Sequence, residues 1–187
     1  MRALILVAAL LAPLPALAHP GGDHVHGFAA GFLHPLGGLD HLAAMLAVGV
    51  WATLAGGAAR WLLPGGFLAG MLAGALLGMA GVGLPLMEAG ILASVIVLGV
   101  LVAAAARLRL TFALPLVAAF GLLHGHAHGT EMAGGAAGYA LGFLLATAML
   151  HASGLAIGWR TGTGAGRVAL RASGGAAAAV AALLLAI

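Results

Sequence analysis

Two short stretches hold most of the side chains in this sequence that could do chemistry. They read HPLGGLDH from residue 34 and LHGHAHGTE from residue 123, and both interrupt otherwise apolar surroundings. Their candidate ligands are His34, Asp40, His41, His124, His128 and Glu131. Imidazole nitrogens together with carboxylate oxygens suit divalent ions such as Ni²⁺, Co²⁺, Zn²⁺ and Cu²⁺. The carboxylates can serve as ligands, or they can orient the imidazoles through the second ring nitrogen.

Helical spacing separates the histidines of the second stretch. His124, His128 and Glu131 stand at positions i, i+4 and i+7, which share one face of an α-helix. His126 falls on the opposite face. The spacing therefore predicts that His124 and His128, and not His126, face a common site.

The first stretch is interrupted by a proline. A proline disfavours helical geometry in the residue before it, so His34 is expected to cap or precede the helix that follows. Asp40 and His41 are expected within the first turns of that helix, with Met45 one turn further along.

Two further groups of residues could meet a metal. His151 is either a hydrogen-bonding partner between helices or a later station on a transport path, and Met45 is placed to join such a path. A polar segment near the N-terminus could capture metal, although such a segment is also commonly only a disordered terminus. Its candidate ligands are His19, Asp23, His24 and His26.

The composition is that of a membrane protein. Of 187 residues, 64% are hydrophobic and only 6% are charged, whereas a soluble domain is about one quarter charged. The absence of cysteine excludes disulfides and thiolate metal sites. The arginines are not clustered among aromatics as in a nucleic-acid binder, and no Walker A loop indicates a nucleotide.

The N-terminus has the pattern of a cleavable signal peptide. Arg2 precedes a short apolar run, and Ala16-Leu17-Ala18 forms an A-x-A cleavage signature. We therefore expect a signal peptide over residues 1–18, a His-bearing periplasmic segment over 19–34, and a transmembrane domain over 35–187.

The predicted fold is all-α, a polytopic membrane protein with six transmembrane helices. Spans are expected at 36–57, 62–81, 87–106, 111–130, 133–158 and 168–187, each near the length that crosses a bilayer. With the mature N-terminus outside, every arginine of the mature chain falls on the cytoplasmic side and every acid on or near the outer side. This places the chain in the bacterial inner membrane with both termini periplasmic, and it brings both histidine stretches to the outer level.

Glycines recur every four residues in two of the predicted spans. They are Gly66, Gly70, Gly74 and Gly78 in the second span and Gly134, Gly138 and Gly142 in the fifth. Small residues at this spacing let membrane helices approach closely. Such faces can pack within one chain or between the protomers of a homo-oligomer.

The two histidine stretches resemble the HupE/UreJ family of nickel permeases. The family pattern H-x5-D-H is matched by His34, Asp40 and His41, and the pattern F-H-G-x-[A/V]-H-G-x-E is matched from His124 to Glu131, with Leu123 in place of Phe. His126 occupies the variable position. The resemblance implies nickel uptake that supplies hydrogenase or urease maturation.

The expected function is therefore a permease for Ni²⁺, with Co²⁺ as the alternative cargo and no tightly bound cofactor. The runner-up is an intramembrane metal-dependent enzyme, which would need an open coordination position and a general base. No serine is expected beside a suitable base, because Ser94, Ser153 and Ser173 lie in other spans or at cytoplasmic levels. A bis-histidine haem protein is disfavoured. Its histidine pairs usually lie at both levels of the membrane, whereas these histidines lie at one level beside two acids.

Overall fold

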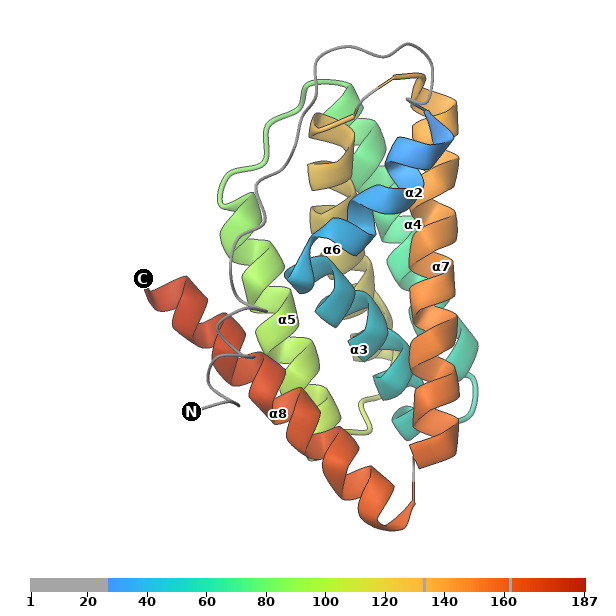
Figure 1. Ribbon diagram of the computed structural model, residues 1–187, viewed down its shortest axis with the longest axis vertical. Coiled ribbons are helices and arrows are strands. Elements are labelled where there is room, and N and C mark those ends of the chain that lie inside the picture. The colour runs from blue at the N-terminus through green and yellow to red at the C-terminus, as the bar shows by residue number, and fades with distance from the viewer. Residues whose placement is uncertain (1–26, 133, 162) are drawn as a thin grey trace, which may run out of the picture.

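The computed structural model describes residues 27–132, 134–161 and 163–187, and the regular structure in these residues is helical throughout (Figure 1). The predicted signal peptide and the residues His19, Asp23, His24 and His26 lie outside this part of the chain. The helices are α2 (Phe28–Gly37), α3 (Leu39–Ala55), α4 (Ala59–Met79), α5 (Met87–Ala104), α6 (Leu110–Thr130), α7 (Ala136–Thr161) and α8 (Gly164–Ala186).

Five of the described helices, α4 to α8, are long and apolar enough to cross a membrane. A sixth span results if α2 and α3 are counted together, although their axes differ by 87° at the break between them. The predicted all-α membrane fold is therefore confirmed, and the helices from α4 to α8 begin and end within a few residues of the expected bounds.

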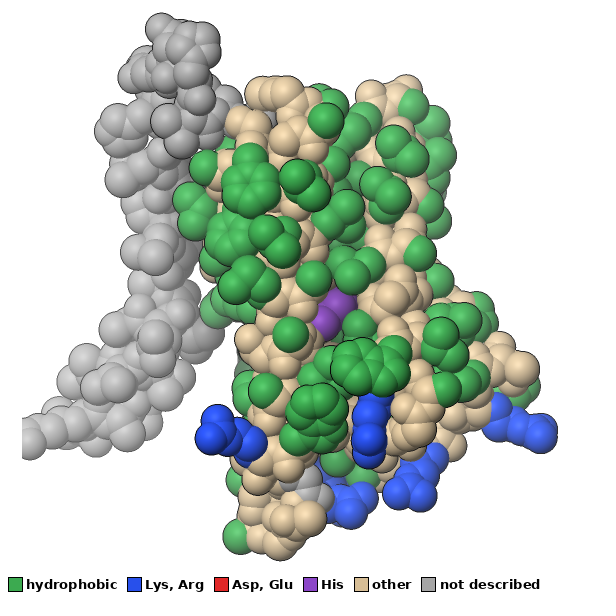
Figure 2. Space-filling view, turned by 90° about the vertical axis from the view of Figure 1, so that its right-hand side faces the viewer, with side chains coloured by type: hydrophobic (Ala, Val, Ile, Leu, Met, Phe, Trp, Pro, Cys, Tyr) green, Lys and Arg blue, Asp and Glu red, His purple; other side chains and the backbone are tan. Residues whose placement is uncertain are grey.

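The described arginines gather at one end of the helix bundle. Arg60 lies in the first turn of α4, Arg107 and Arg109 lie between α5 and α6, and Arg160 lies in the last turn of α7. Arg167 and Arg171 lie in the first turns of α8, and Arg171 donates to the carbonyl of Ala103 near the end of α5. Figure 2 shows their side chains together below a broad apolar surface. The junction of α2 with α3 and the end of α6, which carry the two histidine stretches, lie away from this end.

Glycines bring α4 and α6 into backbone contact, as the four-residue spacing predicted. A Cβ built on Gly74 would clash with the carbonyl of Leu122, and one on Gly125 would clash with the carbonyl of Met71. These helices form the most extensive pair in the bundle. Because hydrocarbon surrounds the protein, such close van der Waals packing replaces the hydrophobic drive of a soluble core.

His34 precedes α3, the helix that holds Asp40 and His41 in its first turn, as predicted. The expectation that Pro35 keeps His34 out of helical geometry is wrong. His34 and Pro35 both lie inside α2, which begins at Phe28 within the expected polar segment. The local cost of proline is outweighed by packing, because Gly31 of α2 lies directly against the backbone of Tyr139 in α7. The helix then ends at Gly37, and Gly38 adopts an extended conformation from which α3 departs in a new direction.

Candidate metal site

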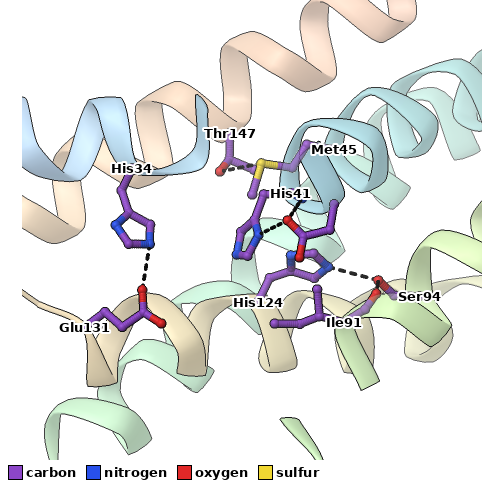
Figure 3. Close-up of polar contacts among 9 residues, drawn as sticks. His34, His41, Met45, Ile91, Ser94, His124, Glu131 and Thr147 are labelled. Carbon is purple, nitrogen blue, oxygen red and sulfur yellow. Dashed lines mark hydrogen bonds and ion pairs between the residues drawn. The ribbon is translucent and has the colours of Figure 1, made fainter. Parts of the chain in front are cut away.

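Four histidines converge where α2, α3 and the last turns of α6 meet. The ring centroid of His41 lies 4.7 Å from that of His124 and 5.0 Å from that of His128. The ring of His34 lies 4.7 Å from His128 and 6.4 Å from His41. In Figure 3, His34 points from α2 towards Glu131 at the end of α6, and His41 and His124 lie close together. The two stretches predicted to share a level are therefore in contact.

Asp40 is bound to the histidine that follows it. Its Oδ1 accepts hydrogen bonds from the backbone N–H of His41 at 2.7 Å and from Nδ1–H of the same residue at 2.9 Å. A carboxylate only accepts, so the proton lies on Nδ1 and the Nε2 lone pair of His41 is left bare. Gly38 leaves room for this pair, since a Cβ there would lie 2.7 Å from Asp40 Oδ1.

Glu131 contacts the imidazole of His34 as Asp40 contacts that of His41. The Nε2 of His34 lies 3.1 Å from Oε2 of Glu131, which directly follows α6. By the same argument the neutral imidazole carries its proton on Nε2, leaving Nδ1 as the lone pair. Both carboxylates thus contact imidazoles as the orienting partners of metal-binding histidines do.

The deeper histidines are completely enclosed. His124 and His128 have no exposed surface, and His41 is 13% exposed. Among the residues that the structure describes, the buried ring nitrogens without a hydrogen-bond partner include Nε2 of His41, Nδ1 of His124 and both nitrogens of His128. Each unpaired buried polar group costs about 1–3 kcal/mol. Several of them in one cluster indicate a site that is satisfied by something outside the chain.

Aromatic rings enclose the cluster on its inner side. Phe143 stacks on His128 with an interplanar angle of 9°, and Phe67 lies 5.5 Å from His124. Tyr139 lies 6.1 Å from His34, and its buried hydroxyl has no partner among the described residues. These three residues could not be predicted from the sequence, because single aromatics in apolar helices carry no signal of a polar neighbour.

Two open cavities reach the cluster from the side. One of about 660 Å³ is lined by His34, Asp40, His41 and Glu131 together with α2 residues. The other, of about 260 Å³, shares Asp40, His41 and Glu131 and is also lined by Glu88 in the first turn of α5. The sequence predicts Glu88 at the outer level but does not place it at the site. Only the arrangement of α5 beside α3 reveals that it lies at the mouth.

The side chains are near one another without enclosing an ion. In the described part of the chain, no group of three or more His, Asp or Glu residues is arranged to hold a metal as it stands. The rings of His41, His124 and His128 meet edge to face, with angles of 80° and 82° at His41. Some of these side chains must therefore shift before their lone pairs can point at one centre.

His126 and His151 make their hydrogen bonds outside the cluster of four histidines. His126 lies on the far side of α6, where Nε2–H donates to the carbonyl of Val82 and Nδ1 lies 2.9 Å from Met87 Sδ. The prediction that it faces away is confirmed. His151 donates from Nδ1 to the carbonyl of Met45 at 2.7 Å, which is a contact between helices, and its Nε2 is bare.

One expectation about serine is wrong. The hydroxyl of Ser94 on α5 lies 2.9 Å from Nε2 of His124, so a serine does stand beside a histidine of the cluster. The prediction failed because α5 is apolar on all sides, and its sequence gives no indication of which face meets α6.

Comparison with known proteins shows the family of the chain. A family model described as "HupE / UreJ protein" matches residues 7–184. The chain belongs to the HupE/UreJ family. Protein HupE of Rhizobium leguminosarum bv. viciae, a member by name, is 42% identical over 175 residues, which cover 92% of each chain. No solved structure matches this HupE/UreJ protein. The resemblance carried by the two histidine stretches is thus confirmed.

Proposed function

We propose that this protein is a permease that takes up Ni²⁺ from the outer side of the bacterial inner membrane, with Co²⁺ as the alternative cargo. The observation that carries the proposal is the convergence of four imidazoles and two carboxylates from α2, α3 and α6 inside an apolar helix bundle. An ionisable group in a membrane helix is costly to insert, by about 2.5–3.5 kcal/mol at the centre for a charged residue. A functional role explains why so many are kept together.

The donors of this capture site would be nitrogens of His34, His41, His124 and His128. Asp40 and Glu131 hold two of these rings by hydrogen bonds, and either carboxylate can join the ion when the rings turn. Because the site opens through side cavities and does not enclose an ion in advance, binding would be reversible. Reversible binding is what a transport site requires, since the ion must leave again.

The side of the membrane that the cluster faces follows from charge. The histidine cluster lies away from the end that carries the arginines, and arginine-rich ends face the cytoplasm. The cluster would then face the periplasm, where both termini would also lie. The predicted segment with His19, Asp23, His24 and His26 would bring metal to this mouth, and Met45 and His151 would lie further along the path.

The choice of nickel comes from the family, whose members are associated with nickel or cobalt and with hydrogenase or urease. The donor set alone does not select it, because Cu²⁺ outbinds Ni²⁺ at most sites of this kind. The proposed role is supply of nickel for the maturation of a hydrogenase or a urease.

Uptake of radioactive Ni²⁺ into nickel-starved cells tests the proposal. Cells expressing the wild type are compared with His41→Ala, His128→Ala and empty vector at matched membrane abundance. His126→Ala is the matched control, because His126 lies on the same helix as His128 but faces away. Loss of uptake in the first two variants and its retention in the control supports the permease. If cells with the wild type take up no more Ni²⁺ than cells with empty vector, the permease proposal is wrong and a metal-dependent enzyme is favoured instead.

A further inference from the structure

Ser94 is the one serine that touches the histidine cluster in the described part of the chain. It lies on α5, is completely buried, and faces the last turns of α6. Its Oγ lies 2.6 Å from the carbonyl oxygen of Ile91 and 2.9 Å from Nε2 of His124 (Figure 3). These two contacts determine where the protons lie.

A serine hydroxyl has a single proton to donate, and a carbonyl oxygen can only accept. We assign the hydroxyl proton of Ser94 to its contact with Ile91, which is the shorter of the two. Towards His124 the hydroxyl oxygen must act as the acceptor, so Nε2 of His124 carries the hydrogen. A neutral imidazole has one N–H group, and its other nitrogen, Nδ1, is then a bare lone pair.

This lone pair belongs to the cluster. Nδ1 of His124 is buried without a partner, and the ring lies 4.7 Å from that of His41. His41 is fixed in the opposite sense, because its Nδ1–H donates to Asp40 and its Nε2 is bare. Two neighbouring rings thus present one lone pair each, Nδ1 from His124 and Nε2 from His41.

We propose that Ser94 is a positioning residue that holds His124 as the Nε2–H tautomer and so presents Nδ1 to the divalent metal ion. The inference rests on the proposed function for the identity of the ligand, and the tautomer rests on assigning the Ser94 hydroxyl proton to the shorter contact, that with the Ile91 carbonyl. It assigns to a neutral hydroxyl the role that Asp40 has for His41. Partners of this kind typically change metal affinity about 10- to 100-fold when removed.

The same geometry argues against Ser94 as a nucleophile. An activated serine gives its proton to the neighbouring base. Here the hydroxyl proton goes to the Ile91 carbonyl, and His124 donates towards Ser94. The pair therefore orients the imidazole and does not activate the serine.

The test uses the full-length protein in lipid, with ¹⁵N-labelled histidine and Ni²⁺ as the probe. Nitrogen chemical shifts distinguish the two neutral tautomers, and the signal of His124 is assigned by its loss in His124→Ala. Ni²⁺ affinity is measured by calorimetry on the same samples. Ser94→Ala removes the acceptor while keeping a good helix former, and Ser94→Thr restores a hydroxyl.

Ser173→Ala is the matched control. Ser173 donates to the carbonyl three residues earlier, that of Leu170, at 2.8 Å, as Ser94 does to Ile91. It lies on α8, outside the histidine cluster. The control therefore removes the same kind of backbone contact without removing the acceptor of His124.

The expected result is an Nε2–H signal for His124 in the wild type, in Ser94→Thr and in the control. Ser94→Ala is expected to lose that preference and to bind Ni²⁺ about 10- to 100-fold more weakly. An Nδ1–H signal in the wild type, or a tautomer or affinity unchanged in Ser94→Ala, would overturn the proposal. If the wild type binds no Ni²⁺, the nickel permease itself fails, and the tautomer signals still decide whether Ser94 orients His124.

Discussion

Nε2 of His34 lies 3.1 Å from Oε2 of Glu131, and this contact joins α2 to the residue that follows α6. The pair links the two histidine stretches at the mouth of the cluster. Glu131 is 58% exposed, so the contact contributes only about 1 kcal/mol or less to stability. Its importance is expected in metal capture and not in folding.

The first prediction concerns this pair. His34→Ala and Glu131→Ala are each expected to reduce Ni²⁺ uptake with little change in membrane abundance. Because the two residues act together, the double variant should lose no more than the more damaging single variant. Uptake kinetics in the three strains measure this, and fully additive losses would show that the residues act independently.

A second prediction separates two roles of Asp40. Its Oδ1 accepts two hydrogen bonds from His41, and the carbonyl oxygen of an asparagine can accept them as well. If Asp40 mainly orients His41, Asp40→Ala should weaken Ni²⁺ binding by about 10- to 100-fold and Asp40→Asn by less. Calorimetry on purified protein distinguishes the two. Equal losses would instead indicate that the negative charge itself meets the ion.

A third prediction concerns the contact between α4 and α6. Gly125→Ala is expected to push α6 away from the backbone of Met71 and to destabilise the protein by about 1–3 kcal/mol. Gly65→Ala is the control, because a Cβ at this exposed position of α4 meets nothing within 4 Å. Thermal unfolding followed by tryptophan fluorescence compares them. A Gly125→Ala protein as stable as the control would contradict the close packing.

The fourth prediction concerns Glu88 at the second cavity. Glu88→Gln removes a negative charge near Asp40 and His41 without placing new bulk in the mouth. Because such a charge raises the local concentration of cations, uptake should fall most at low external Ni²⁺ and recover when Ni²⁺ is abundant. The dependence of the initial uptake rate on Ni²⁺ measures this. A lower maximal rate with unchanged KM would place Glu88 in a later step.

Several features could be predicted from the sequence because their causes are local. Apolar runs of bilayer length predicted the helices from α4 to α8. The four-residue glycine spacing predicted that α4 packs closely on a neighbouring helix, and the structure identifies that helix as α6. The 100° rotation per residue separated His124 and His128 from His126. The sequence patterns also identified the family, which the comparisons confirm.

The tertiary structure alone decided how these parts meet. The segment α2 is helical despite Pro35 because it packs against α7, and its axis is turned by 87° from that of α3. Residue propensities do not include this packing, so they could not predict the helix. Ser94 and Glu88 belong to a helix that is apolar on all sides, so no periodic pattern indicates which face meets the cluster. Their places depend on how α5 is rotated against α3 and α6, and that rotation is determined by contacts between segments distant in sequence.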